Sequence, residues 1–327
     1  MQPDQKSGGQ ALLRMSDDTL TQNLASRVGS LHLRQRQGIQ RDHVTQIFGR
    51  GRNFFHIENW YSIHGIVRLA MRLIGCYGRG RRNAARIRVT HNRVPLHNLP
   101  GPCVGFTLLH LSDLHLDMSE EIVEGLIASI QGLSYDACVI TGDFRARTYG
   151  GFHETLDVMG RVRAHLSGPI YGVLGNHDFI EMVPGLEALD VRILLNESIV
   201  LRKGGGSLFL AGVDDPHYYR MENLEKAAEG IPPDSPSILL SHSPEIYRHA
   251  AHAGFDLMLC GHTHGGQICL PGGIPVTYNA HCPRDMGRGA WRYHDLQGYT
   301  SSGAGTCIVD ARFNCPPEVT LHHLVTG

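Results

Sequence analysis

Two histidines separated by one residue follow a short apolar run late in the chain. The run is Leu257–Cys260, and after Gly261 come His262 and His264 in a glycine-rich turn. A short apolar run that ends at glycine is typical of a buried strand. The two imidazoles would then stand at the carboxyl end of a strand, where α/β sheets bind their ligands. Since the chain has 21 histidines, this pair carries weight only together with other segments.

Four other segments repeat the pattern of an apolar run, a small residue and then Asp, Asn or His. Continuous apolar runs are typical of parallel strands that are buried on both faces. Their polar ends would converge on one rim of the sheet. These ends are Asp113 and His115 after 106–111, Asp143 after 137–140, Asn176, His177 and Asp178 after 170–174, and His242 after 237–240.

Each polar residue, taken alone, also has an ordinary structural explanation. Asp113 could cap a turn or a helix, Asn176 could occupy a left-handed turn, and His242 could lie in a surface loop. Turns do not require this series of residue types at five strand ends. We therefore interpret the segments together as a site for two metal ions.

The order D-x-H, G-D, G-N-H-D, S-H and G-H-x-H resembles the calcineurin-like metallophosphoesterase superfamily over residues 106–324. The segments 261–267 and 303–318 are similar to the YkuE-type branch, some members of which cleave the pyrophosphate of a UDP-diacylglucosamine in lipid A synthesis. The resemblance implies a four-layer α-β-β-α sandwich, two mixed sheets flanked by helices, whereas the strand–helix alternation itself indicates only α/β. The expected helices are Glu120–Gln131, His153–Leu166, Leu224–Glu229 and Glu245–His252.

The resemblance also assigns two metal sites that share one carboxylate. A bridging carboxylate partly neutralises two cations about 3.5–4 Å apart, and a water between them yields hydroxide that can attack phosphorus. Nitrogen and oxygen donors without a thiolate suit Mn²⁺, with Fe or Zn²⁺ as alternatives, rather than Ca²⁺. The implied ligands are Asp113, His115, Asp143 and His264 for one ion, and Asp143, Asn176, His242 and His262 for the other.

Three residues beside the ligands are candidates for the reaction itself. In the family, the histidine after the ligand asparagine faces the substrate, which assigns His177 to charge stabilisation and to protonation of the leaving group. Asp178 could orient His177, and Arg145 could bind phosphate as a bidentate donor. Ordinary structural roles are the alternative for Asp178 and Arg145. The acidic segment Asp214–His217 lies outside the five blocks, and we interpret it as a cleft wall or turn.

Charge is distributed unequally along the chain. Residues 1–104 carry 16 Lys and Arg against 5 Asp and Glu, and residues 105–327 carry 14 against 26, although the net charge is only −1. An acidic catalytic domain at 105–327 suits two bound cations. A basic extension at 1–104 implies an anionic partner: membrane lipid, nucleic acid or another protein.

The basic extension contains one amphipathic stretch near residues 60–77. Its apolar residues recur at helical spacing and are accompanied by arginines, which is typical of a helix that lies in a membrane interface. It is too short and too charged to span a bilayer. The alternative is that it packs on the catalytic domain, and nucleic acid is disfavoured because stacking aromatics are lacking. Residues 1–50 show little periodicity, so we expect poor order there. The apolar positions are Trp60, Ile63, Val67, Ala70 or Met71, and Ile74.

These patterns lead to one preferred function and two alternatives. We expect a metal-dependent hydrolase of UDP-2,3-diacylglucosamine or a similar membrane lipid, or else of a soluble phosphodiester such as a cyclic nucleotide. The alternative to an enzyme is a scaffold that keeps the fold and has lost its metals. It is disfavoured because every ligand position of the family holds a residue that can bind metal. We expect a cytoplasmic protein peripheral to the inner membrane, because residues 1–30 lack an apolar signal-peptide region and the 8 cysteines form no C-x-x-C pair.

Overall fold

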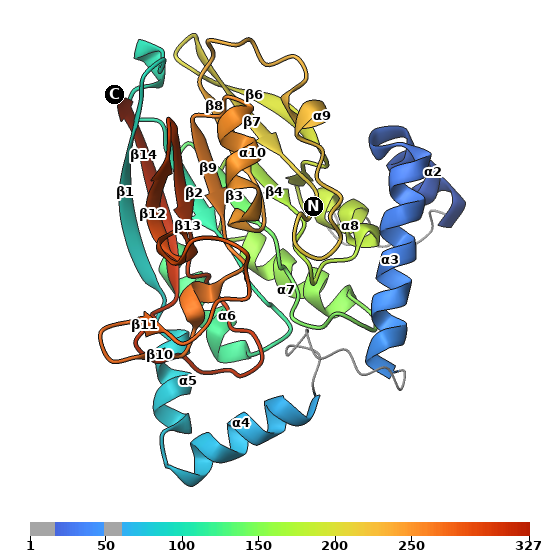
Figure 1. Cartoon of the computed structure of the whole chain (residues 1–327), viewed down its shortest axis with the longest axis vertical. Helices are drawn as coiled ribbons and strands as arrows, with labels where there is room; N and C mark the ends of the chain where they lie inside the picture. Colours follow the sequence, from blue (N-terminus) through green and yellow to red (C-terminus); the bar gives the residue numbers. More distant parts are fainter. Residues whose placement is uncertain (1–16, 49–60) are drawn as a thin grey trace, which may run out of the picture.

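Two six-stranded sheets pack face to face at the centre of the molecule (Figure 1). The computed structural model describes the backbone of residues 17–48 and 61–327, and the side chains of residues 21–42 and 67–327. Both sheets contain parallel and antiparallel neighbours, as expected for mixed sheets. The first sheet has the order β1 (Arg88–Leu96), β14 (Glu318–Thr326), β2 (Thr107–Leu111), β3 (Ala137–Thr141), β4 (Ile170–Val173), β5 (Val191–Ile193). The second has the order β12 (Gly289–Tyr293), β13 (Leu296–Thr300), β9 (Leu257–Cys260), β8 (Ser237–Leu240), β7 (Gly206–Gly212), β6 (Glu197–Lys203).

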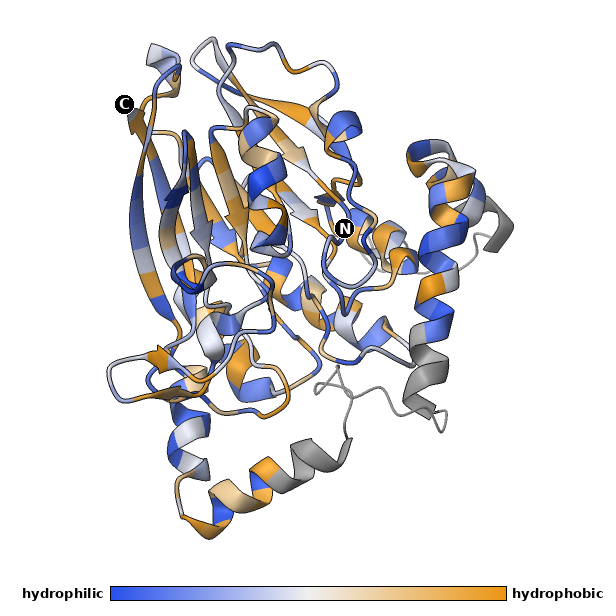
Figure 2. Cartoon of the chain, viewed as in Figure 1, coloured by the Kyte–Doolittle hydropathy of each residue, from blue (hydrophilic) through white to orange (hydrophobic). Residues whose placement is uncertain are grey.

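Helices cover the outer face of each sheet, which confirms the four-layer sandwich. One apolar cluster joins the first sheet to its helices, a second fills the space between the sheets, and a third joins the second sheet to its helices. In Figure 2 the central strands are accordingly rich in hydrophobic residues. The covering helices are α6 (Glu120–Ile130), α7 (His153–Arg163) and α8 (Val183–Ala188) on the first sheet, and α9 (Leu224–Ala228) and α10 (Tyr247–His252) on the second.

The helices expected at 120–131, 153–166, 224–229 and 245–252 are confirmed with small changes at their ends. Helix α10 starts later than expected because its first turn is a separate 3-10 helix. The remaining short elements lie in the connections. They are β10 (Cys269–Leu270), β11 (Ile274–Pro275), η2 (Gly101–Cys103), η3 (Ile180–Met182), η4 (Pro244–Ile246), η5 (His264–Gly266) and η6 (Arg284–Gly287).

The N-terminal region is more ordered than its sequence indicates. We expected little order in residues 1–50, but residues 17–48 form helices α2 (Asp17–Val28) and α3 (Ser30–Phe48). Leu24 and Leu33 join the apolar cluster of the first sheet. The expectation is therefore wrong for this stretch, because a few apolar contacts combine with polar contacts that the sequence pattern does not reveal. Residues 1–16 and 49–60 lie outside the described residues.

The expected amphipathic helix is present as α4 (Tyr61–Leu73), followed by α5 (Tyr77–Ala85). Val67 and Met71 pack against a loop of the catalytic domain, as the alternative interpretation proposed. Ile74 follows the end of the helix and is exposed. Trp60 lies outside the described residues, as does the side chain of Ile63. Among the helices that the structure describes, none is long and apolar enough to cross a membrane.

Strand β1 belongs to the first sheet although it lies in the basic extension. It pairs in parallel with β14 along its whole length, from Arg88 opposite Glu318 to Leu96 opposite Thr326. The sheet therefore begins before the boundary at residue 105 that the charge distribution indicated.

Candidate metal centre

The five polar segments meet at one rim of the sandwich, because β2, β3, β4, β8 and β9 all end there. Their turns are tight. A side chain at Gly175 would place its Cβ 2.1 Å from Oδ1 of Asp143. Non-glycine residues with positive φ are uncommon and cluster at functional sites, where the surrounding structure holds them. Five of the seven predicted ligands have this conformation: Asp113, His115, Asp143, His262 and His264, with φ of 50°, 43°, 55°, 70° and 50°.

The first set of predicted ligands forms one cluster. Nε2 of His115 lies 3.1 Å from Nε2 of His264, which in turn lies 3.6 Å from Oδ1 of Asp113. Oδ2 of Asp143 lies 3.7 Å from Nε2 of His115. All four residues are buried. Their donor atoms can therefore converge on one ion.

The second set forms a neighbouring cluster around His242. Its Nε2 lies 2.9 Å from Oδ1 of Asn176 and 3.1 Å from Nδ1 of His262. The same nitrogen lies 3.4 Å from Oδ2 of Asp143. One oxygen of Asp143 thus lies close to both sets, which is the position that a shared carboxylate requires.

Backbone carbonyls orient three of the imidazoles for metal binding. Nδ1 of His115 is 2.9 Å from the carbonyl of Arg145, and Nδ1 of His242 is 2.8 Å from that of Thr141. Nε2 of His262 is 2.6 Å from the carbonyl of Asn279. A ring nitrogen facing a carbonyl must carry the proton, which leaves the other nitrogen of a neutral imidazole free as a ligand. The free nitrogens face one another and Asp143, so this donor set fits divalent cations.

A family model described as calcineurin-like phosphoesterase matches residues 106–266. A metallophosphoesterase of Aquifex aeolicus is 31% identical over 228 residues, which cover 65% of this chain and 83% of that relative. The chain belongs to the calcineurin-like metallophosphoesterase family. It is therefore a metal-dependent hydrolase of phosphoester bonds, and its family implies a dinuclear site for divalent metal ions.

Two further relatives differ in their names and in how much of them is matched. The phosphodiesterase YaeI of Escherichia coli is 26% identical over 238 residues, covering 67% of this chain and 82% of the relative. A bovine transmembrane protein with a metallophosphoesterase domain is 34% identical over 255 residues, covering 71% of this chain but only 56% of the relative. This metallophosphoesterase thus spans little more than half of the bovine protein.

The buried carboxylates of the centre need positive charge beside them. Burial raises the pKa of Asp143, but the imidazoles of His242 and His177 outweigh burial and hold it well below its usual range. Burial lowers the pKa of His242, but Asp143 and Asp113 outweigh it and raise that pKa to about 10. Burial lowers the pKa of His115 to about 4 and keeps its imidazole neutral. Buried carboxylates of this kind are stabilised by a proton on a neighbouring imidazole or by a metal cation.

His177 lies beside the shared carboxylate. Its Nε2 is 3.8 Å from Oδ2 of Asp143, and its backbone amide donates to Oδ1 of Asp143 at 2.9 Å. Nδ1 faces the carbonyl of Ala146 at 2.5 Å. The ring is thus oriented by a carbonyl, with Nε2 toward Asp143.

Asp178 and Arg145 support the loops of the centre. The carboxylate of Asp178 accepts hydrogen bonds from the amides of Gly175 at 2.9 Å and Arg145 at 3.3 Å, so it orders the backbone around His177. Burial, and then the charge of Asp143, raise the pKa of Asp178 to about 7. The guanidinium of Arg145 is fully buried and lies over the ring of Phe179, 4.4 Å from its centroid. A contact between Arg145 and phosphate would require this side chain to move, and it stays a prediction.

Helix α3 supplies a support that the sequence interpretation missed. Nη2 of Arg36 donates to the carbonyl of Asp178 at 2.9 Å, and Nε donates to Asp214 at 3.4 Å. Oε1 of Gln40 accepts from the amide of Ile180 at 3.2 Å. Helix α3 therefore braces the loop that carries Asn176 and His177. Asp214, which we interpreted as a cleft wall or turn, is a partner of this helix.

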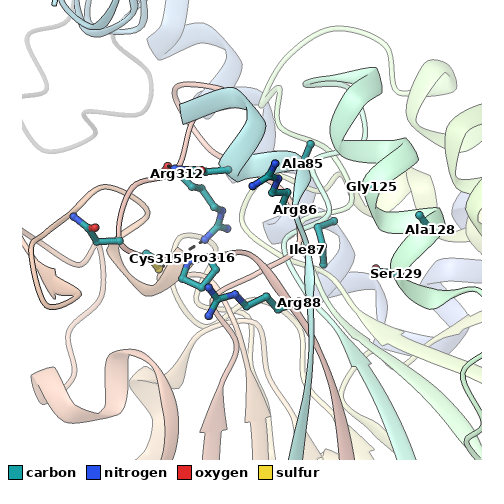
Figure 3. Close-up of a pocket in the computed structure, with 12 residues that line it drawn as sticks. Ala85, Arg86, Ile87, Arg88, Gly125, Ala128, Ser129, Arg312, Cys315 and Pro316 are labelled. Carbon is teal, nitrogen blue, oxygen red and sulfur yellow. Dashed lines mark hydrogen bonds between the residues drawn. The ribbon is translucent and has the colours of Figure 1, made fainter. Parts of the chain in front are cut away.

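Arg312 supports the other side of the centre and was also missed. Its side chain is fully buried, and Nη1 donates to the carbonyl of His264 at 3.3 Å. Nη2 donates to the carbonyls of Ser302 and Gly305 at 2.7 and 2.6 Å. Arg312 lines a cavity of about 700 Å³ together with Arg86 and Arg88. Figure 3 shows these three side chains. None of the predicted ligands lines this cavity.

Proposed function

We propose that the enzyme hydrolyses a phosphodiester or pyrophosphate bond in a membrane-bound lipid, with UDP-2,3-diacylglucosamine as the specific candidate. The observation that carries the proposal is an exposed apolar surface at the end of α4, a helix that packs on Val309 and Ala311 of the catalytic domain. Membrane lipid is accordingly the proposed anionic partner of the basic region, and the protein would bind the membrane peripherally.

The proposed ligands are those predicted from the sequence. Asp143 would be shared because its Oδ2 lies within 3.4 and 3.7 Å of imidazoles from both clusters. Imidazole and oxygen donors suit Mn²⁺, Fe or Zn²⁺. Asp113, His115 and His264 would complete one site, and Asn176, His242 and His262 the other.

When bound, the two divalent ions would acidify a water molecule and draw charge from the phosphoryl oxygens. His177 would provide general acid chemistry, since Nδ1 faces the carbonyl of Ala146 and Nε2 lies beside Asp143, where it could deliver a proton to the leaving oxygen. Asp178 and Arg36 would keep the His177 loop in place through its backbone.

Helix α4 supplies the proposed lipid contact. Leu69 and Leu73, one helical turn apart, are 57% and 79% exposed, and Ile74 is 75% exposed. Burying such a side chain in an apolar phase contributes about 1.5–3 kcal/mol. Each arginine near an anionic surface adds about 1 kcal/mol. Arg72 is exposed on the same helix, so apolar and basic groups lie together.

The test compares the wild-type protein with a variant in which Leu69, Leu73 and Ile74 are all serine. We expect the wild type to float with vesicles that contain phosphatidylserine, and to release UMP from UDP-2,3-diacylglucosamine in mixed micelles. The triple variant should lose flotation and most of the lipid hydrolysis, but should cleave bis-p-nitrophenyl phosphate at the wild-type rate.

Leu31→Ser is the matched control, because Leu31 is 62% exposed on α3, away from this surface. It should leave flotation unchanged. Equal flotation of the triple variant and the wild type would refute the lipid contact. Failure of wild-type protein to release UMP would exclude this lipid as the substrate.

A soluble phosphodiester is the second candidate, and it is favoured by the similarity to the E. coli protein named as a phosphodiesterase. In that case the enzyme would cleave bis-p-nitrophenyl phosphate or a cyclic nucleotide, and vesicles would not change the rate.

A further inference from the structure

A cysteine lies next to the first metal cluster, although the sequence interpretation included no thiolate. The Sγ of Cys307, one ring nitrogen of His115 and one ring nitrogen of His264 all lie within 4.8 Å of one another. We propose that Cys307 supplies a thiolate ligand to the ion held by His115 and His264 and biases that site toward Zn²⁺ or Fe²⁺ over Mn²⁺. This inference rests on the proposed metal ligation.

The turn that carries His264 also fixes the loop that carries Cys307. The side chain amide of Gln267 donates to the carbonyls of Cys307 at 2.8 Å, Val309 at 2.9 Å and Ala311 at 3.2 Å. Its carbonyl accepts from the amide of Cys307 at 2.8 Å. One side chain thus ties the 307–311 loop to the turn of His264, so the thiol and the imidazole are held at a set spacing.

The backbone beside Cys307 is in a conformation that is costly for its residue type. Ile308 has a φ of 65°, in the left-handed region that β-branched residues avoid. Residues in sparsely populated conformations persist only where the surrounding structure holds them there. Gln267 is one such determinant, and the packing of Val309 against Met71 of α4 is another. These contacts hold the backbone beside Cys307 in one conformation.

The three donor atoms of Cys307, His115 and His264 lie near the spacing of ligands on one ion. Zn²⁺ binds sulfur at about 2.3 Å and imidazole nitrogen at about 2.0–2.1 Å, so two such ligands lie at most about 4.4 Å apart. The three donor atoms lie within 4.8 Å of one another, so a small approach of the Cys307 loop would bring them within this value. Binding would release the thiol proton to solvent, because only the thiolate is a ligand.

The donor type determines the metal preference. Thiolate is a soft ligand that favours Zn²⁺ and Fe²⁺, whereas Mn²⁺ prefers oxygen donors. The second cluster, with Asn176, His242 and His262, would lack a thiolate. The two sites would therefore differ, with the softer one at His115 and His264.

The experiment uses the full chain with Co²⁺ in place of its metal, because a cobalt–thiolate bond gives a near-ultraviolet charge-transfer band. We expect this band in the wild type, its loss in Cys307→Ser, and its retention in Cys76→Ser, whose thiol is similarly part-buried but lies between α4 and α5. Zn²⁺ affinity at one site should fall by roughly tenfold or more in Cys307→Ser, the scale on which even outer partners of metal ligands act. Mn²⁺ affinity should change much less.

A second measurement needs no variant. In the wild type, Zn²⁺ should protect Cys307 from iodoacetamide, as read by peptide mass, while Cys76 and Cys282 react equally with and without metal. An unchanged cobalt band in Cys307→Ser, or equal alkylation of Cys307 with and without Zn²⁺, would overturn the proposal. If the cobalt–thiolate band is present but the protein does not hydrolyse UDP-2,3-diacylglucosamine, the proposed function is refuted. The assignment of Cys307 as a ligand would still hold.

Discussion

Replacing Arg36 by methionine tests whether helix α3 contributes to the stability and activity of the catalytic domain. Arg36 is fully buried, and its guanidinium carbon lies 3.1 Å from the centroid of the Tyr219 ring. Its charge is balanced by Asp214, which is also fully buried. Methionine keeps much of the apolar volume, so the substitution removes mainly charge and hydrogen bonds.

The expected loss of stability follows from the partner that is left behind. Removing one member of a buried ion pair costs about 3–5 kcal/mol, because the other charge stays buried. Asp214 retains His32 at 2.9 Å and the amide of Asp215 at 2.8 Å, so we expect the lower end, about 3 kcal/mol. The urea midpoint at constant slope measures this change.

Activity should fall as well, since the bond from Arg36 to the carbonyl of Asp178 is lost. We expect kcat for a soluble diester to drop about tenfold, with both metal ions still bound. Arg34→Met is the matched control, because Arg34 is exposed on the same helix. The double variant Arg36→Met/Asp214→Asn should recover much of the stability, since it removes the unpaired charge. If Arg36→Met has the same urea midpoint and kcat as Arg34→Met, then helix α3 does not hold the loop of Asn176 and His177 in place.

Two further predictions concern histidines. His177→Gln should lower kcat by about 10²–10⁴-fold without loss of metal, as measured by metal content per chain, and a fall in metal content would show that His177 is a ligand instead. Burial lowers the pKa of His110 to about 3 in the folded protein, from about 6.5 in the unfolded chain, so the unfolded state binds more protons between these values. Stability should therefore fall by about 2 kcal/mol from pH 7 to pH 5 through His110 alone. His110→Gln, followed by urea unfolding at both pH values, should reduce this loss, and an equal loss in the variant would contradict the assignment.

The strand–helix alternation predicted an α/β fold, and the family resemblance predicted the two-sheet sandwich. The strand ends could be located because the ligands follow uninterrupted apolar runs. The sequence was not sufficient to predict how the N-terminal extension packs on the catalytic domain. Helix α3 packs a polar row against the catalytic domain, whereas an amphipathic pattern has apolar residues at such positions. The row, spaced one helical turn apart, is His32, Arg36 and Gln40. Its partners Asp214 and Asp178 lie far away in the chain, so only the folded structure shows that the row is satisfied.

Two other features depended on tertiary contacts. Strand β1 contains arginines that made it resemble part of the basic extension, yet it pairs with β14 in the first sheet. Cys307 lies in no recognisable ligand spacing, and it reaches the metal cluster through the bonds that Gln267 makes to its loop. Gln267 follows His264 closely in the sequence. Its role in holding the 307–311 loop could not be inferred, because that loop lies about forty residues further along the chain.

The most direct test of the central claim is the metal content and diesterase activity of Asp143→Ala. If Asp143 is shared by both ions, the wild type should hold two divalent ions per chain and lose hydrolysis of bis-p-nitrophenyl phosphate on chelation, with recovery on adding Mn²⁺. Asp143→Ala should lose ions from both sites and at least about 10²-fold in rate. Wild-type hydrolysis by Asp143→Ala would contradict the account.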